Sequence, residues 1–120
     1  MTKFSMTKPI QKYKVVIAQS GKVDVKERKR YIIEHFKYRE LANNFSRKVK
    51  KAALDLAVLP QGYEKTEFQY RGYDIYFRPT NTYLLFFTID EMKHTVTVLR
   101  VLQDGMNWKY IINRWLKENA

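Results

Sequence analysis

The sequence has no cysteine, only four glycines and three prolines, and no long apolar run among its 120 residues. The absence of cysteine excludes disulfides, thiolate metal ligands and cysteine nucleophiles. The longest apolar runs are a handful of residues, well below the ~20 that a membrane-spanning helix needs. The opening segment MTKFSMTKPIQK also lacks the apolar region of a secretion signal. We therefore expect a cytoplasmic protein with no membrane partner.

Recognisable catalytic motifs are also missing. The two histidines, His35 and His94, lie far apart without metal-ligand spacing, so we interpret each as an ordinary surface or half-buried side chain. There is no glycine-rich phosphate loop, no Ser-His-Asp order and no pair of carboxylates at catalytic spacing, because Asp90 and Glu91 are neighbours in an expected turn. Motifs alone thus assign no catalytic residue, no metal site and no cofactor.

What the chain does have is enough apolar material for one core. It is 45% hydrophobic and 15% aromatic, which suits a single folded domain of this length and argues against disorder. Residues 1–12 are polar and aperiodic, so we expect a flexible N-terminal tail followed by one domain over residues 13–120. Met1 and Met6 remain alternative starts.

Positive charge is concentrated in the first half of the chain. Residues 1–51 hold 15 Lys and Arg against 4 Asp and Glu, hence +11, whereas residues 52–120 hold 8 of each. A field of one sign attracts a polyanion or an acidic protein partner. The count itself does not distinguish the two.

The first half predicts a strand and a helical hairpin. Residues 13–18 are β-branched and end at Ser20 and Gly21, which indicates a strand and a turn. A helix to about Lys37 should then begin with Asp24 as its cap. A second helix is predicted from Arg39 to Leu59, because its apolar residues recur at steps of three and four, ending before Pro60. The short connection between the helices favours an antiparallel hairpin.

The second half predicts three strands and a last helix. Alternating or continuous apolar residues indicate strands at residues 73–78, 82–90 and 94–102, and Asn107 can cap the final helix. Val96, Val98 and Arg100 should share one face of the last strand, with Val101 on the other. The expected fold is α+β, in the order β-α-α-β-β-β-α: an antiparallel meander sheet with the N-terminal helical hairpin packed on one face and a C-terminal helix.

The meander brings certain residues to one rim of the sheet. Arg78, Asn81, Tyr83 and Gln103 should meet there, with His94 at the opposite rim. On the second helix the cations Arg47, Lys48, Lys50 and Lys51 either grip phosphates or form an ordinary solvated face. The tyrosines at 70, 73 and 76 either stack on bases or pack in the sheet, and the two tryptophans fit core contacts.

Three stretches carry a resemblance: YKVVIAQSG, VDVKERKRYIIEHF and above all YLLFFTIDEMKHTVTVLRVLQDGMNW. With the order of elements, they resemble the RelE/ParE superfamily of toxins from bacterial type II toxin–antitoxin modules, over about residues 13–112. The resemblance implies a toxin neutralised by a cognate antitoxin whose C-terminal segment wraps it. An acidic segment would suit the basic half of the chain. It also implies that operator DNA is contacted only through the antitoxin.

The superfamily implies two activities. RelE-like toxins cleave mRNA in the ribosomal A site with cations and often a tyrosine or histidine at one sheet rim. Here Leu84 stands where that branch tends to carry an arginine, and Gln103 and Asp104 stand where it carries basic residues. For a ribonuclease, the remaining candidates are Arg71, Tyr76, Arg78 and Arg100.

ParE-like toxins poison DNA gyrase by binding, and their pattern VLRVLH-G-R-x-D is closer to VLRVLQDGMNW, although Gln103 replaces the usual His and Asn107 the usual Asp. The leading hypothesis is thus a ParE-like growth inhibitor of gyrase. The alternatives are a ribosome-dependent endoribonuclease and a non-toxic basic nucleic-acid-binding module. The expected contacts with antitoxin or target are Arg47, Lys48, Lys50, Lys51, Arg78, Tyr83, Arg100 and Gln103.

Overall fold

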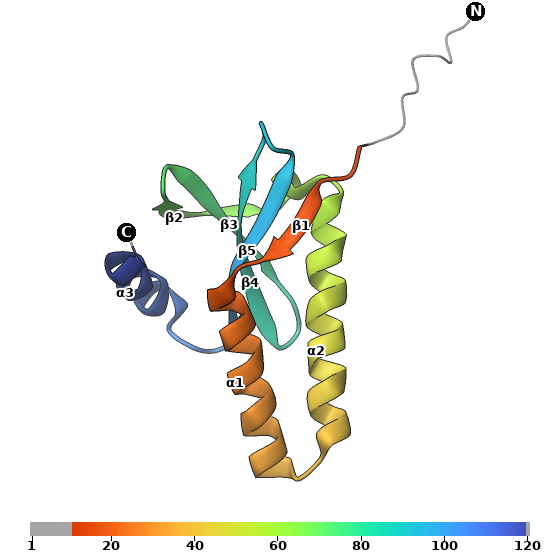
Figure 1. Ribbon diagram of the computed structural model, residues 1–120. Helices are drawn as coiled ribbons and strands as arrows, with labels where there is room; N and C mark the ends of the chain where they lie inside the picture. The colour runs from red at the N-terminus through yellow and green to blue at the C-terminus, as the bar shows by residue number, and fades with distance from the viewer. Residues whose placement is uncertain (1–10, 120) are drawn as a thin grey trace, which may run out of the picture.

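The computed structural model describes residues 11–119, and Figure 1 shows a twisted sheet with two long helices on one side and a shorter helix on the other. Most of the expected tail, residues 1–10, lies outside the described residues. The elements in chain order are β1 (Lys14–Ile17), α1 (Gln19–Phe36), α2 (Arg39–Leu54), the short 3-10 helices η2 (Asp55–Ala57) and η3 (Pro60–Gly62), β2 (Glu64–Tyr70), β3 (Tyr73–Pro79), β4 (Tyr83–Asp90), β5 (Thr95–Gln103) and α3 (Trp108–Asn119).

The five strands form one sheet in the order β1-β5-β4-β3-β2. Strands β2 to β5 pair antiparallel as a meander, and β1 pairs parallel to β5 at the edge. The predicted α+β fold, the order of its helices and the meander from β3 to β5 are therefore confirmed. The structure adds one strand, β2, that the sequence analysis did not predict.

Strand β2 escaped prediction because it is an edge strand rich in charge. Thr66, Phe68 and Tyr70 are half-buried while the residues between them are exposed, which is the alternation of a strand with one covered face. A two-residue turn follows, in which Arg71 and Gly72 both have positive φ, the geometry that tight hairpins favour. Charged side chains on an outer strand discourage pairing with other chains.

Helix α1 begins five residues before its expected cap, and Ser20 and Gly21 lie in its first turn. The Ser20 hydroxyl donates a 2.6 Å hydrogen bond to the Leu99 carbonyl of β5. A Cβ at Gly21 would stand only 3.2 Å from the carbonyl oxygen of Val98, so glycine permits this close approach of helix and strand. Asp24 therefore caps nothing; its carboxylate instead binds β5.

The second helix is shorter than predicted. It ends at Leu54, and η2 and η3 then carry the chain to β2, with Leu59 at a positive φ of 49°. Of the predicted apolar stripe, Val49, Ala52 and Leu56 are buried, but Leu41 and Leu59 are exposed. Leu41 lies in the first turn of α2, and Figure 1 shows that this end of the α1–α2 hairpin extends beyond the sheet. No helix within residues 11–119 is long and apolar enough to cross a membrane.

Each face of the sheet carries its own apolar cluster, because side chains alternate along β4. Leu85 and Phe87 face the hairpin and pack with Val49 and Leu56, as the T-shaped contact of Phe87 with Tyr63 illustrates. The neighbouring residues Leu84 and Phe86 lie in the second cluster with Ile75 of β3, Ile112 of α3 and the α3 tryptophans. Burial of each such side chain stabilises the fold by about 1.5–3 kcal/mol. The prediction that β4 is apolar on both faces is confirmed.

A register shift in β5 changes which of its residues share a face. Phe86 pairs with Arg100 while Phe87 pairs with Val98, so Leu99 is an extra residue in the ladder. Val101 consequently joins Val96 and Val98 in the hairpin-side cluster. The predicted grouping of Arg100 with Val96 and Val98 is wrong, because the bulge reverses the alternation after Val98.

Candidate functional site

The predicted rim forms where β3 and β5 end and β4 begins. Tyr83 pairs with Gln103, and Asp104 N–H donates to the Thr82 carbonyl at 2.9 Å. Thr80 fixes the β3–β4 turn, since its hydroxyl accepts from Tyr83 N–H and donates to the Tyr83 carbonyl. Burial raises the pKa of the Tyr83 phenol, whose ring packs edge-on against Phe45. His94 lies at the other end of β5, so this part of the prediction is confirmed.

Arg100 is held at the rim by an ion pair with α1. Its Nε and Nη2 donate to the two carboxylate oxygens of Asp24 at 2.7 and 2.9 Å, and Val101 N–H donates to the same carboxylate at 2.8 Å. Only 15% of the Arg100 side chain and 11% of the Asp24 side chain are exposed. The guanidinium also lies 5.8 Å from the Trp115 ring. Its charge is thus compensated within the fold.

Arg78 has a different internal partner, the end of α2. Its Nη1 donates to the Ala52 carbonyl at 2.7 Å and to the Asp55 carboxylate at 3.4 Å. The positive charge therefore meets the negative end of the helix dipole as well as a carboxylate. The Tyr63 ring lies 5.6 Å from the guanidinium.

The residues named for a ribonuclease do not converge. Arg71 occupies the β2–β3 turn, at the opposite end of β3 from Arg78, and lies over the Tyr70 ring. Tyr76 packs on Phe87 on the hairpin side of the sheet. Arg100 pairs with Phe86, whose side chain belongs to the α3 side, whereas Arg78 pairs with Leu85 on the hairpin side. The four side chains are spread over both ends and both faces of the sheet.

An apolar groove, here called the rim groove, opens between the hairpin and the rim. Its volume is about 540 Å³, and it brings together three of the predicted contact residues, Tyr83, Arg100 and Gln103. Exposed or half-buried apolar side chains from α1, α2, the loop before α3 and α3 itself complete it: Tyr31, Phe36, Leu41, Phe45, Met106 and Ile111. Its charged lining residues balance in number, with Arg28 and Arg100 against Asp24 and Glu27.

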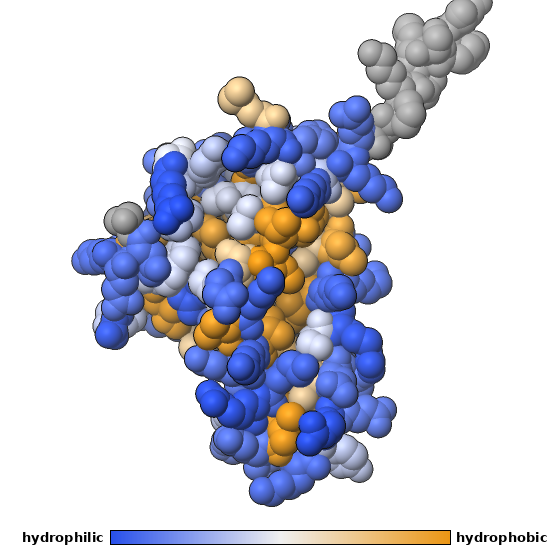
Figure 2. Space-filling view, viewed as in Figure 1, coloured by the Kyte–Doolittle hydropathy of each residue, from blue (hydrophilic) through white to orange (hydrophobic). Residues whose placement is uncertain are grey.

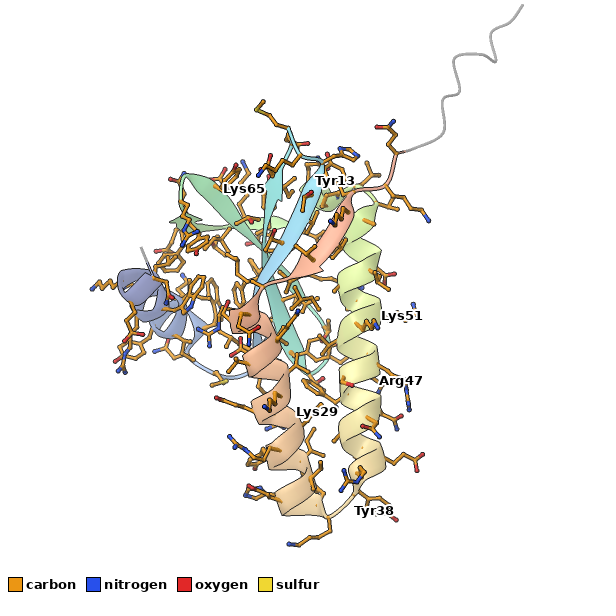
Figure 3. The ribbon with its side chains drawn as sticks, in the orientation of Figure 1. Tyr13, Lys29, Tyr38, Arg47, Lys51 and Lys65 are labelled. Atoms are coloured by element: carbon orange, nitrogen blue, oxygen red, sulfur yellow. The ribbon has the colours of Figure 1, made fainter. Side chains whose placement is uncertain are left out.

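A second groove, here called the hairpin groove, runs between α1 and α2 and has a volume of about 670 Å³. Of the four predicted cations of α2, only Lys50 lines it. Figure 3 shows Arg47 and Lys51 on α2 and Lys29 on the facing helix α1. The cations of α1 that line the groove were not singled out from the sequence, although the spacing of four and three residues between the three lysines is that of one helix face: Lys22, Lys26, Lys29 and Arg30.

The end of the sheet opposite the rim carries a hydrogen-bond network that the sequence did not reveal. The Tyr13 hydroxyl donates to Glu91 at 2.6 Å, and Gln61 donates to the same carboxylate at 2.8 Å. The Tyr13 bond lowers the pKa of Glu91 and raises that of the phenol. The His94 ring stacks on Tyr13 at 3.7 Å, which ties β1 to the β4–β5 turn.

Comparison with known proteins identifies the family. The model of the ParE toxin of the type II toxin–antitoxin system, parDE, matches residues 15–108. No curated protein matches the chain by sequence. A chain in the crystal structure of the toxin–antitoxin complex RelBE2 from Mycobacterium tuberculosis has a similar fold, with a TM-score of 0.59 and 19% sequence identity. That match covers 82% of this chain and 98% of the other. The chain thus belongs to the ParE toxin family of type II toxin–antitoxin systems.

Proposed function

We propose that this toxin inhibits growth by binding an essential protein, with DNA gyrase as the target, and that it does not cut RNA. The observation that supports binding over cleavage is the state of the rim arginines. Arg100 is compensated by Asp24, and Arg78 by Asp55 and the end of α2. Both are occupied in holding the fold together.

Cleavage of RNA through its 2′-hydroxyl needs cations where negative charge develops on the phosphate, and losing one such contact costs about 2.7–4 kcal/mol. At the rim, Gln103 and Asp104 occupy positions just beyond β5, and the two arginines of the rim groove are matched by two carboxylates. A carboxylate repels the scissile phosphate. The local charge therefore favours a protein ligand over an RNA transition state.

The rim groove has the character of a protein-binding surface. Tyr31, Phe36, Leu41 and Met106 expose 42%, 54%, 46% and 45% of their surface around it. Clustered exposed apolar side chains beside polar ones are typical of sites that bind another protein. We propose that the target docks here, with Tyr83, Arg100 and Gln103 at the base of the contact.

Control of the toxin is proposed to come from a cognate antitoxin with an acidic C-terminal segment, through which alone the toxin reaches operator DNA. The basic first half of the chain supports an acidic partner, because opposite charge speeds encounter and excludes other partners.

Three assays test the proposal. Induced expression of the chain alone should stop growth, and the purified protein should inhibit gyrase supercoiling and trap cleaved DNA. Translating ribosomes given the same protein should yield intact mRNA. Codon-positioned cuts in that mRNA, or supercoiling at the uninhibited rate, would contradict the proposal.

A further inference from the structure

Three of the four cations predicted on α2 belong to neither groove. Arg47, Lys48 and Lys51 are exposed, and Figure 3 shows Arg47 and Lys51 on the side of α2 that points away from α1. The steps of four residues from Arg39 through Asn43 and Arg47 to Lys51 place these side chains on successive turns of one side of the helix. The surface formed by these five exposed residues is here called the α2 outer face.

The cations of the α2 outer face have little opposite charge near them. Within residues 11–119, three of the four form no ion pair, whereas Arg78 and Arg100 are both paired. The fourth, Lys51, meets Asp55 only at 4.0 Å, and 81% of its side chain is exposed. Between residues 39 and 51 the chain carries a single carboxylate, Glu40. Such a row of uncompensated cations attracts a ligand that carries several negative charges.

The α2 outer face also lacks the apolar side chains that a protein partner buries. Between residues 39 and 51 the exposed residues are polar or charged, except for Leu41, which lines the rim groove. Figure 2 shows the contrast with the hairpin groove, where hydrophobic surface lies between the two helices. The residues that give that groove an apolar floor are Ile17, Val25, Ile33 and Val49. Protein interfaces have an apolar core, whereas contacts with phosphates need only cations and polar groups, so the α2 outer face suits a nucleic acid backbone.

An aromatic side chain stands at the end of this row of cations, at the tip of the hairpin. Tyr38 lies between the two helices and exposes 62% of its surface, and its neighbours Lys37 and Arg39 are exposed as well. Among residues 11–119, its ring stacks on no other aromatic ring. Aromatic rings beside cations bind single strands, because the ring stacks on an unpaired base while the cations hold the backbone.

The length of the row suits a strand of DNA. Arg39 and Lys51 are twelve residues apart, which is about 18 Å along the helix axis at 1.5 Å per residue. DNA carries one phosphate per about 3.4 Å of each strand, so several phosphates of one strand fit along this distance. The α2 outer face shares no residue with the rim groove, so the two surfaces can hold different ligands at the same time.

We infer that the α2 outer face binds the sugar-phosphate backbone of a DNA strand and that Tyr38 stacks on an unpaired base at the end of this contact. The inference rests on the proposed function for the source of the DNA, because gyrase holds the strands that it cuts. It concerns this DNA and not operator DNA. A toxin that contacts the enzyme through the rim groove and the strand through α2 fastens the two together, which is what trapping of cleaved DNA requires.

A fluorescent oligothymidine of about 15 nucleotides tests the row of cations with the full-length protein in fluorescence polarisation. Arg47→Gln/Lys48→Gln/Lys51→Gln removes three phosphate contacts, so the affinity should fall about tenfold or more. The slope of log K against log salt concentration should flatten by about 2, since each contact with a single strand contributes about 0.7. The matched control, Lys22→Gln/Lys26→Gln/Lys29→Gln, removes the same charge from the hairpin groove and should flatten the slope by less than about 0.7.

Two single variants test the stacked base. Tyr38→Ala should weaken binding of the oligothymidine about fivefold or more, because it removes the stacking of one base. Binding of a duplex of the same length should change by less than about twofold, since paired bases cannot reach the ring. The control is Tyr110→Ala on α3, where 59% of the tyrosine is exposed; it should change neither affinity by more than about twofold.

Equal flattening of the salt dependence in the two triple variants would overturn the inference. Binding of the oligothymidine that is no more sensitive to Tyr38→Ala than to Tyr110→Ala would also overturn it. So would a polyglutamate peptide of the same charge that binds the wild-type protein more tightly than the oligothymidine, because the surface would then be one for acidic proteins. Circular dichroism of each variant confirms that it remains folded.

A gyrase assay separates this inference from the proposed function. Arg47→Gln/Lys48→Gln/Lys51→Gln should need about fivefold more protein than wild type to trap the same amount of cleaved DNA, and the α1 control variant should match wild type within about twofold. DNA binding that meets the expectations above, in a wild-type protein that does not inhibit gyrase, would support the surface and contradict the proposed target. Gyrase inhibition that is identical in wild type and both triple variants would support the target and overturn the inference.

Discussion

At the scale of single residues, the contacts of a charged side chain show whether it is free to bind a ligand or stabilises the fold. Asp24 offers its two oxygens to one guanidinium and one backbone N–H, which fills most of its hydrogen-bonding capacity. Arg100 is equally engaged, with Asp24 on one side and Trp115 on the other. This pair fastens α1 to β5 at the rim, where an unpaired arginine would otherwise attract phosphate.

Asp24→Ala should destabilise the protein by about 3 kcal/mol, because it leaves the largely buried Arg100 without its counter-ion. Urea denaturation followed by circular dichroism measures the loss. Asp104→Ala, an exposed change close to the same rim, should cost no more than about 0.5 kcal/mol. A loss for Asp24→Ala as small as that of the control would show that water compensates Arg100.

A second residue-scale prediction concerns the turn between the helices. Lys37 ends α1 in the left-handed region, with φ of 57° and its N–H bound to the Ile33 carbonyl, which is the position where helices favour glycine. Lys37→Gly should raise the free energy of unfolding by about 0.5–1 kcal/mol by relieving this strain. Tyr38→Gly, where φ is −124°, should lower it instead. The two urea midpoints should move in opposite directions.

At the scale of elements, the two ends of the sheet differ in structure. The rim end borders the rim groove together with the α1–α2 hairpin. At the opposite end, side-chain hydrogen bonds hold the β4–β5 turn in place. There Asp90 accepts from Lys93 N–H at 3.0 Å and from the Tyr73 hydroxyl at 3.0 Å. Together with the Tyr13–Glu91 bond, these contacts tie β1, β3 and the turn to one another.

The free energy of unfolding should fall as the pH is lowered below neutrality, in part because carboxylates of the β4–β5 turn become protonated. The Lys93 N–H lowers the pKa of Asp90, and the Tyr13 hydroxyl lowers that of Glu91, so the folded state favours both carboxylates in their ionised form. This contribution is present above the ordinary carboxyl range, near pH 4, and is lost as the pH falls through the lowered values. Urea midpoints measured from neutral pH down to about pH 3 should fall less steeply for Asp90→Asn. Parallel curves for variant and wild type would contradict this.

The elements that the sequence predicted well are those defined by repeated local pattern. The apolar repeat of α2 and the continuous apolar run of β4 were predicted correctly, because many residues of each segment favour the same secondary structure. The predicted start of helix α1 is too late, because Ser20 and Gly21 are residue types that favour turns. The hydrogen bond of Ser20 to the Leu99 carbonyl and the close approach of Gly21 to β5 involve a strand far along the chain, which the local sequence does not record. The bulge at Leu99 reverses the faces of β5 and depends on pairing with β4, which no local pattern records.

At the scale of the whole molecule, the α1–α2 hairpin separates two surfaces of different chemistry, and no residue lines both grooves. The charge count predicted a basic half, and the rim was placed correctly from strand order. The sequence could not show that the rim arginines are neutralised, since Asp24 lies 76 residues before Arg100. Nor could it show that cations on two helices border a shared apolar floor.

The rim groove is the proposed docking surface for the target, so its exposed apolar side chains should be needed for toxicity. Phe36→Asp/Leu41→Asp places two charges on exposed residues of this groove and should abolish growth arrest while the protein stays folded. The control Met92→Asp changes an exposed apolar residue at the β4–β5 turn, at the opposite end of the sheet, and should leave growth arrest unchanged. Growth curves after induction, with circular dichroism of the purified variants, measure both properties. Growth arrest retained by a folded Phe36→Asp/Leu41→Asp variant would place target binding on another surface.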